Sequence, residues 1–254
     1  MNKEELEKIK KKKESENKNK IKYCNLVSFG NCIDVIISDC KFIIKEQEKE
    51  YIDELSSLEM LALSILLMDE CNFRVGNSKY KESTGLLTIE TKHVDIDKNQ
   101  IQFNGKKQVE NTCRMKNKFL IEHIRQIWDY VDNDVYDQKK MLFSLENGTM
   151  RVYPNDINKF LQIYDRNFSA KIFRTWKANK YFFDKIKTLE IPSTVRGFQS
   201  NIKTAIEFAA KHLYHTPAIC KRAYIDNRLI DLYKQNPEAV ISSNLNDIFE
   251  SLCN

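Results

Sequence analysis

The spacing of apolar residues changes twice along the chain, and this change restricts the fold more than any other feature. Residues 24–70 carry apolar side chains mostly at helical spacing, although the β-branched run Val35–Ile37 also suits a strand. Short apolar runs at 86–89, 93–96 and 101–103 then alternate with polar turns, as antiparallel strands do. Asn104-Gly105 is a strong hairpin signal directly after the third run.

Helical spacing returns from about residue 116 and continues towards the C-terminus. The expected helices cover residues 119–131, 156–164, 170–189, 202–212, 217–234 and 245–252. The sequence therefore predicts a mainly α fold with a small antiparallel β-sheet insertion (α+β), in one domain over residues 23–254. Residues 1–22 contain nine Lys and five Glu, so we expect a basic low-complexity arm there, disordered or a frayed solvated helix.

Composition points to a protein that is not secreted. The net charge of +5 permits nucleic-acid binding without requiring it. The N-terminus lacks the apolar segment of a signal peptide, and no apolar run approaches the roughly 20 residues of a membrane span. The seven cysteines form no C-x-x-C pair and no cluster with histidine, so we expect reduced structural thiols, no metal site and an intracellular location.

The run H-T-P-A-I-C-K-R-A-Y places His215 nine residues before Tyr224. Thr216 suits the N-cap of a helix and Pro217 suits its first turn, so Tyr224 is expected about two turns into that helix. Two long side chains at this spacing could converge on a single phosphate.

Cleavage of a phosphodiester by a tyrosine needs a definite set of partners. The phenol has a reference pKa of about 10, so it attacks as a neutral group that loses its proton. Negative charge spreads over the non-bridging oxygens, which arginine forks bind well, and the leaving 5′ oxygen needs a proton from a general acid. A tyrosine, two arginines, a lysine and a histidine meet these needs without a metal or nucleotide cofactor.

This chain carries such a set in distinctive local sequences. Arg74 lies in F-R-V-G-N-S-K-Y, just after an apolar helix. Lys106 follows the hairpin turn, and Arg174 lies in K-I-F-R-T-W-K-A-N. His215 and Tyr224 complete the order along the chain.

These elements and their order resemble the type IB DNA topoisomerases, in particular the short enzymes of poxviruses and other large DNA viruses. That family carries F-R-x-G-x-x-K-Y, a G-L-L-T-like strand, a glycine-lysine hairpin tip, K-x-[FL]-R-T-[YW]-x-x-N and H-T-P-x-x-x-K-R-A-Y. All five occur here in that order, over roughly residues 24–240. The last two are the most specific, whereas the hairpin lysine is the least specific because Lys107 adjoins Lys106.

The resemblance implies the tyrosine recombinase/type IB topoisomerase catalytic fold and an enzyme without cofactors that relaxes supercoils by transient single-strand cleavage and religation. It implies Tyr224 as the nucleophile that forms a 3′-phosphotyrosyl link, and Lys106 as general acid to the leaving 5′ hydroxyl. Arg74, Arg174 and His215 are the implied contacts of the scissile phosphate. The same match gives as supporting DNA contacts Lys79, Tyr80, Lys171, Asn179 and Lys221.

The viral members of this family have a small N-terminal β domain that completes a clamp around the duplex, whereas a lysine-rich arm precedes the helical region here. Either the clamp domain is absent, or the chain is a catalytic fragment, or another polypeptide supplies the clamp. We expect a monomer that acts on duplex DNA in a cytoplasmic viral factory, a virion or the nucleus. Contacts mainly to phosphates would make its binding strongly salt-dependent.

Two other functions stay open. A tyrosine recombinase or integrase-type strand transferase shares the nucleophile and the cations, but in that class a histidine normally stands three residues before the second arginine. This chain has Lys171 at that position. A non-catalytic DNA-binding relative would have no need of all five chemical residues, so their presence argues against it.

Overall fold

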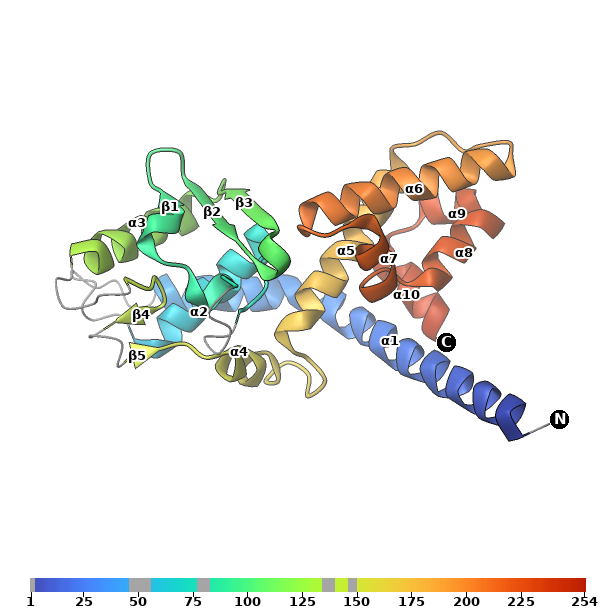
Figure 1. Cartoon of the computed structure of the whole chain (residues 1–254), viewed down its shortest axis with the longest axis horizontal. Coiled ribbons are helices and arrows are strands. Elements are labelled where there is room, and N and C mark those ends of the chain that lie inside the picture. The colour runs from blue at the N-terminus through green and yellow to red at the C-terminus, as the bar shows by residue number, and fades with distance from the viewer. Residues whose placement is uncertain (1–2, 46–55, 77–82, 134–139, 146–149) are drawn as a thin grey trace. The chain divides into compact units, whose positions relative to one another are not determined.

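A computed structural model describes residues 3–45, 56–76, 83–133, 140–145 and 150–254 of the chain (Figure 1). Helices dominate this part, together with a three-stranded antiparallel sheet and a smaller two-stranded one. The predicted fold class, mainly α with a small antiparallel sheet, is confirmed. Within the described ranges, no helix combines the length and apolar character that crossing a membrane requires.

The chain divides into two compact units. Unit 1 comprises residues 1–32, 175–210 and 216–254, and unit 2 comprises residues 33–174 and 211–215. Residues of both units occur in the helices α1 (Lys3–Lys45), α5 (Ala170–Lys187) and α6 (Val195–His212). The predicted single domain over residues 23–254 thus consists of two units with interleaved chain segments, and its boundaries as a functional domain stay a prediction.

Helix α1 runs through residue 22 without a break, so the predicted basic arm is helical where it is described and is continuous with the apolar part of the same helix. Lysine and glutamate are good helix formers, and the buried side chains of Tyr23, Leu26 and Phe29 anchor the next turns of the helix. The ambiguous run Val35–Ile37 belongs to the same helix rather than to a strand.

Unit 2 is organised around α2 (Ser57–Cys71), in which every residue from Met60 to Met68 is buried. A helix that is apolar all round belongs in the centre of a core. Ser56 and Glu59 form a capping box at its start, since the Ser56 amide donates to the Glu59 carboxylate at 2.6 Å and the Glu59 amide donates to the Ser56 hydroxyl at 3.3 Å. The other elements of unit 2 are η2 (Leu86–Thr88), η3 (Thr91–His93), β1 (Val94–Asp95), β2 (Gln100–Asn104), η4 (Lys106–Gln108), β3 (Glu110–Arg114), α3 (Lys118–Asn133), β4 (Ser144–Leu145), β5 (Met150–Arg151) and α4 (Pro154–Leu161).

The three-stranded sheet of unit 2 has the order β1-β2-β3, and neighbouring strands are antiparallel. Strands β1 and β2 confirm the predicted strands at 93–96 and 101–103. β2 and β3 pair along their full lengths, from Gln100 opposite Arg114 to Asn104 opposite Glu110. Strand β3 was not predicted because E-N-T-C-R has almost no apolar side chain, and only pairing with β2 makes this polar segment a strand.

The predicted strand at 86–89 is wrong, because Leu86 to Thr88 form the short 3-10 helix η2. Its first amides bond a segment that is not a strand of the sheet: Leu86 N donates to Arg74 O at 2.7 Å, and Leu87 N donates to Val75 O at 2.8 Å. The apolar run is buried as a strand would be, but it pairs with the segment that follows α2.

The described part of unit 1 contains four short helices, α7 (Pro217–Ala223), α8 (Asn227–Gln235), α9 (Pro237–Ser242) and α10 (Leu245–Cys253), beside its parts of α1, α5 and α6. The ring centroid of Trp176 lies 6.3 Å from that of Phe29 and 6.2 Å from that of Phe249, so α1, α5 and α10 share one aromatic core. Gly30 permits this close approach, since a Cβ there would lie 2.5 Å from the Trp176 ring.

The predicted continuous helix over residues 217–234 is also wrong. Helix α7 ends at Ala223, and α8 begins at Asn227. Asp226 is the N-cap of α8, because its carboxylate accepts a hydrogen bond from the Arg228 amide at 3.0 Å. Tyr224 is therefore the C-cap residue of α7 and lies in the connection between two helices, not inside one.

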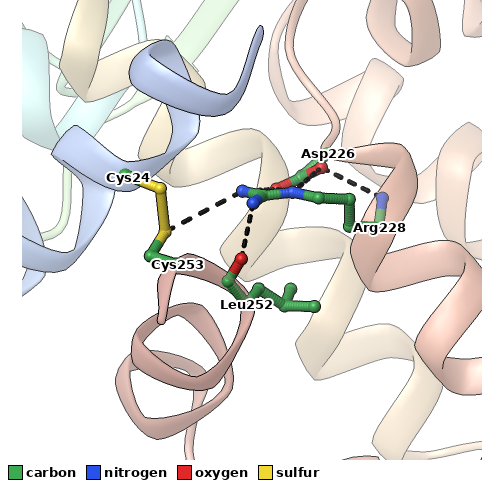
Figure 2. The surroundings of a disulfide bond; sticks show 5 residues. All are labelled: Cys24, Asp226, Arg228, Leu252 and Cys253. Atoms are coloured by element: carbon green, nitrogen blue, oxygen red, sulfur yellow. Dashed lines mark hydrogen bonds and ion pairs between the residues drawn. A yellow bond between two sulfur atoms is a disulfide. The ribbon is translucent and has the colours of Figure 1, made fainter. Parts of the chain in front are cut away.

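Two disulfide bonds in the described part of the chain contradict the expectation of reduced thiols. Cys24 of α1 is bonded to Cys253 of α10 in unit 1 (Figure 2), and Cys71 of α2 is bonded to Cys113 of β3 in unit 2. The partners lie 229 and 42 residues apart in sequence, yet their Cα atoms are 5.6 and 5.4 Å apart, which suits a disulfide. Short-range cysteine spacing carries no sign of such pairs, since only the folded chain brings them together.

Candidate active site

The segment from Asn72 to Gly76 follows α2 and carries Arg74. Asn72 ends the helix with φ 56°, and Gly76 has φ 79°, a conformation that favours glycine. Gly76 packs directly on Gly85, where a Cβ would lie 2.5 Å from the Gly76 Cα. Together with the two backbone bonds from η2, this contact joins the F-R-V-G and G-L-L-T motifs into one structural element.

Phe73 connects this element to the β2–β3 hairpin. Its buried ring lies 4.7 Å from Phe103 of β2 and 5.8 Å from Tyr214, measured between ring centroids. The Tyr214 hydroxyl donates to the carbonyl of Thr112 in β3 at 2.9 Å. The Arg74 segment, the hairpin and residues 211–215 therefore hold one another in place.

Lys106 lies exposed in the loop of the β2–β3 hairpin. The Asn104-Gly105 signal correctly predicts the end of β2, but the loop is longer than a two-residue turn. Gly105 N donates to Val109 O at 2.8 Å, and Lys107 has φ 63°. The disulfide between α2 and β3 adds a covalent link at the base of this hairpin.

Arg174 lies near the start of α5 and is buried. Its guanidinium donates to the carbonyl of Asn72 and, through Nη2, to the carbonyl of Leu213 at 2.6 Å. Both carbonyls lie just past a helix end, where the helix itself supplies no donor. Two backbone partners from different segments fix the orientation of this guanidinium.

The imidazole of His215 lies against both arginines. Arg174 Nη2 is 2.9 Å from Nε2, and Arg74 Nη2 is 3.2 Å from each ring nitrogen. A guanidinium can only donate and a neutral imidazole has one acceptor nitrogen, so not all of these contacts are hydrogen bonds at once. Arg74, Arg174 and His215 are here named the cationic cluster, and the two guanidinium groups concentrate positive charge at one place and so suit an anion.

Burial, followed by the positive charges of Arg174 and then Arg74, lowers the pKa of His215 from 6.5 to about 3. The ring is therefore neutral at pH 7 and keeps one N–H. An imidazole with so low a pKa is a weak base, which suits it to donate a hydrogen bond rather than to accept a proton.

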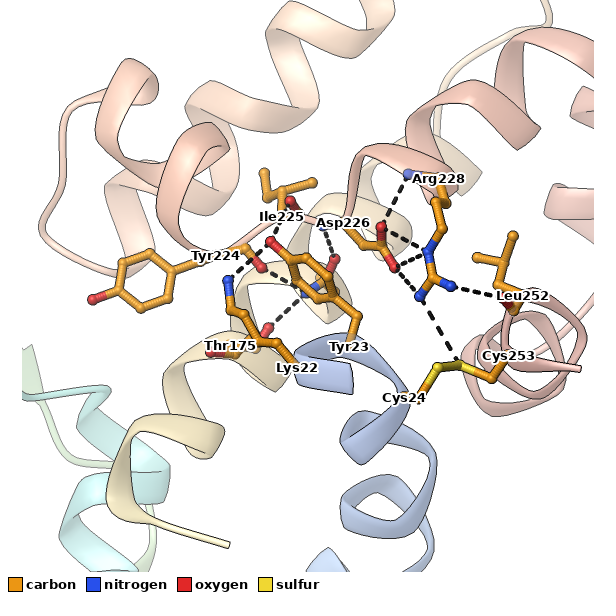
Figure 3. Close-up of polar contacts among 11 residues, drawn as sticks. Lys22, Tyr23, Cys24, Thr175, Tyr224, Ile225, Asp226, Arg228, Leu252 and Cys253 are labelled. Carbon is orange, nitrogen blue, oxygen red and sulfur yellow. Dashed lines mark hydrogen bonds and ion pairs between the residues drawn. A yellow bond between two sulfur atoms is a disulfide. The ribbon is translucent and has the colours of Figure 1, made fainter. Parts of the chain in front are cut away.

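Tyr224 belongs to unit 1, so its distance from the cationic cluster of unit 2 stays a prediction. Its backbone has φ −130° and ψ −33° at the end of α7, and its carbonyl accepts a hydrogen bond from Asn179 Nδ2 at 2.9 Å. The ring points away from these backbone contacts (Figure 3). Because Tyr224 lies at the end of a helix, the hydrogen bonds of the surrounding backbone determine the position from which its side chain extends.

Asn179, expected to contact DNA, has a different environment. It is completely buried, its Nδ2 donates to the carbonyls of Thr175 and Tyr224, and its Oδ1 accepts from the Asp226 amide at 2.9 Å. This geometry corrects the expectation, because the whole amide is used inside the protein. Asn179 holds the α7–α8 connection instead.

The other expected DNA contacts remain predictions. Lys171 and Lys221 are exposed on α5 and α7, respectively. Lys79 and Tyr80 lie outside the described residues. In the part of the chain that the structure describes, no three His, Cys, Asp or Glu side chains are grouped as the ligands of a metal ion would be.

Lys22 and Tyr23 were not predicted as site residues, yet their side chains bond the backbone on either side of Tyr224 (Figure 3). Both lie at the C-terminal end of the lysine-rich arm, so nothing in the sequence distinguishes Lys22 from the other lysines of that arm. The only sequence signal is that Tyr23 begins the apolar spacing that continues through Leu26 and Phe29.

The chain matches the family described as "Eukaryotic DNA topoisomerase I, catalytic core" over residues 7–242, and it belongs to that family. It is 28% identical over 210 residues to DNA topoisomerase 1B of Acanthamoeba polyphaga mimivirus, covering 76% of this chain and 60% of that protein. It is 26% identical over 222 residues to DNA topoisomerase 1B of Vaccinia virus (strain Copenhagen), covering 83% of this chain and 65% of that protein. The resemblance to the type IB topoisomerases of large DNA viruses is confirmed, and the chain spans less than two thirds of the length of these relatives.

Proposed function

We propose that this chain is a type IB DNA topoisomerase, which relaxes supercoils by cutting one strand of a duplex and resealing it. The observation that carries the proposal is the convergence of Arg74 and Arg174 on His215. Two guanidinium groups and a neutral imidazole at one place suit the oxygens of a phosphodiester. Membership of the topoisomerase I family supports DNA as the source of that phosphodiester.

In the proposed reaction the Tyr224 oxygen attacks the scissile phosphorus, so a Tyr–O–P bond forms while the bond from phosphorus to the 5′ oxygen breaks. The phenol loses its proton to water, and Lys106 gives a proton to the leaving 5′ oxygen. The product is a 3′-phosphotyrosyl link and a free 5′ hydroxyl. Religation runs the same steps backwards, with the 5′ hydroxyl as nucleophile.

The cationic cluster would act on the charge that develops in the transition state. Arg74 and Arg174 would bind the non-bridging oxygens, and His215 would donate its single N–H to one of them. Because fixed donors need no reorganisation at the moment of reaction, loss of one typically costs on the order of 100- to 1000-fold in rate.

The phosphotyrosyl link preserves the energy of the phosphodiester, so resealing needs no nucleotide hydrolysis. The proposed activity is therefore independent of ATP. It would need no metal cofactor, because Arg74, Arg174 and Lys106 would supply the positive charge and the proton. Lys171 and Lys221 would add contacts to duplex phosphates, which predicts binding that weakens steeply with salt. A monomer acting inside the cell, and a separate polypeptide that supplies a clamp, stay predictions.

Relaxation of supercoiled plasmid in EDTA without ATP tests the proposal. We expect relaxation by the wild-type chain and none by Tyr224→Phe, which removes only the attacking oxygen. Tyr153→Phe is a matched control, because Tyr153 is an exposed tyrosine outside the proposed site. A plasmid that stays supercoiled with ample wild-type protein at low salt contradicts the proposal, as does full relaxation by Tyr224→Phe.

A further inference from the structure

Three consecutive backbone carbonyls around Tyr224 accept hydrogen bonds from side chains far away in sequence (Figure 3). Lys22 Nζ donates to Ala223 O at 2.7 Å, and Tyr23 OH donates to Ile225 O at 2.8 Å. Asn179 Nδ2 donates to the carbonyl of Tyr224 between them. All these residues belong to unit 1, and Lys22 and Tyr23 are adjacent on α1.

The location of these bonds has a simple physical cause. Helix α7 ends at Ala223, and the last carbonyls of a helix have no partner within it. In most proteins a glycine-containing turn or water satisfies such carbonyls, whereas here α1 and α5 do so with side chains. The ammonium group of Lys22 also stands at the negative end of the helix dipole, where a cation is favourable.

The hydroxyl of Tyr23 is suited to a permanent hydrogen bond with the carbonyl of Ile225. The residue is buried, and burial, with the negative charge of Asp226 as the next cause, raises the pKa of its hydroxyl well above the ordinary value of 10. The hydroxyl therefore stays protonated and remains a donor at any pH at which the protein is used. Lys22 Nζ donates a hydrogen bond to the oxygen of the same hydroxyl at 3.0 Å, so the two side chains also support each other.

The C-terminal end of the α7–α8 connection, at Asp226, is also held by side-chain contacts. The buried Asp226 carboxylate accepts hydrogen bonds from Arg228, with Oδ2 2.8 Å from Nη2, and Arg228 Nη1 donates to the carbonyl of Leu252 at 2.7 Å (Figure 2). The next residue after Leu252 is Cys253, which the disulfide joins to Cys24, directly after Tyr23. The backbone around Tyr224 is thus tied to α1 directly by two hydrogen bonds and indirectly through Arg228, the C-terminal end of α10 and the disulfide.

We infer that Lys22 and Tyr23 are positioning residues for the tyrosine nucleophile: by holding the backbone at Ala223 and Ile225, helix α1 fixes the direction in which the Tyr224 ring leaves α7. This inference rests on the proposed role of Tyr224 as nucleophile. It assigns to α1 a part in DNA cleavage that needs no contact between α1 and DNA.

The consequence is a defect in rate without a defect in binding. A displacement of the reacting atom by about 1 Å can cost on the order of 100-fold. We therefore expect Tyr23→Phe, which deletes only the hydroxyl, to slow cleavage roughly 10- to 100-fold. Attack by the phenol and its departure on religation use the same geometry, so both directions should slow equally and the cleavage equilibrium should stay the same.

The experiment uses supercoiled plasmid mixed with excess protein, stopped with detergent at successive times, digested with protease and scored for nicked circles. Tyr233→Phe is the matched control, because Tyr233 is a buried tyrosine of unit 1 whose hydroxyl accepts a hydrogen bond from Asn201 Nδ2 at 3.1 Å, outside the α7–α8 connection. The melting temperature of each variant is measured to verify that the variant is folded at the assay temperature. The affinity for a duplex is measured by fluorescence anisotropy with Tyr224→Phe added to each variant.

Three results together support the inference. Tyr23→Phe reaches the same nicked fraction as wild type but more slowly, its affinity for the duplex is unchanged, and the cleavage rate of Tyr233→Phe stays within about twofold of wild type. Equal rates in Tyr23→Phe and Tyr233→Phe overturn the inference and leave the proposed function intact, provided that Tyr224→Phe is inactive. Absence of nicked circles with the wild-type chain removes both the inference and the proposed function.

Lys22 gives a second test, at the carbonyl of Ala223. Lys22→Met removes the donor and the charge, whereas Lys22→Arg keeps both. We expect a fall in cleavage rate of roughly 10-fold in the methionine variant and substantial rescue in the arginine variant. Equal rates in the two variants and wild type contradict a positioning role for Lys22.

Discussion

The unusual electrostatics of His215 can be tested directly by changing the pH. Burial and the two neighbouring arginines lower its pKa from 6.5 to about 3, a difference of roughly 3.5 units. At about 1.36 kcal/mol per unit this corresponds to roughly 5 kcal/mol at full effect. Because the ring is only partly buried, solvent screens the charges, and we expect about half of that, on the order of 2 kcal/mol.

The sign is set by which state binds the proton. Between about pH 3 and 6.5 the unfolded chain carries a protonated His215 and the folded chain does not. The free energy of unfolding is therefore unaffected by this group above about pH 6.5 and falls as the pH drops from there towards 3. In His215→Gln this part of the pH dependence should be absent.

Two measurements check this. Proton NMR of the imidazole signals, with the His215→Gln spectrum for assignment, gives the pKa of His215 itself. Urea unfolding of wild type and His215→Gln at pH 7 and pH 5 gives the stability difference. A His215 that titrates within one unit of 6.5, or identical pH dependence in the two proteins, would refute the reasoning. Added sulfate should raise the pKa of His215, since an anion between the arginines offsets their charge.

Three further predictions concern the surroundings of the cationic cluster. Arg74→Ala removes one of the two charges, so NMR should show a higher pKa for His215 and plasmid assays a cleavage rate lower by on the order of 100-fold; an unchanged pKa contradicts the geometry. Replacing Cys71 by serine opens its bond to Cys113 and should lower the free energy of unfolding by about 2–4 kcal/mol in urea titrations, an effect that disappears if the wild type is studied with reductant. Gly76→Ala, at φ 79°, should destabilise the protein by about 1 kcal/mol or more, whereas equal stability would show that the turn adapts.

Much of the fold could be predicted because apolar spacing reports directly on elements that bury one face. The helices at 119–131 and 170–189 and the strands at 93–96 and 101–103 were predicted close to their observed bounds. The errors occurred where pairing with a distant segment decides the local structure. Strand β3 has too few apolar side chains to be detected, and the run at 86–89 is apolar but forms η2 because its amides bond Arg74 and Val75.

The end of helix α7 just before Tyr224 was missed for the same reason. Residues 217–234 have helical spacing throughout, so local sequence favours one helix. The chain turns instead, because Asp226 caps α8 while Lys22, Tyr23 and Asn179 supply partners for the carbonyls at the end of α7. Those partners come from helices that start far earlier in the chain.

The sequence by itself determined the family, because five motifs stand in the order that is characteristic of it, and it supplied the residue types that the proposed phosphoryl transfer requires. It also determined the class of fold, since helical and strand spacings differ by simple geometry. Only the tertiary structure decided that Arg74 and Arg174 meet on His215, that burial, together with these two charges, lowers the pKa of the imidazole, and that helix α1 holds the backbone on either side of Tyr224. Contacts, burial and electrostatic interactions depend on distances in space, and residues hundreds of positions apart in sequence come close together only when the chain folds.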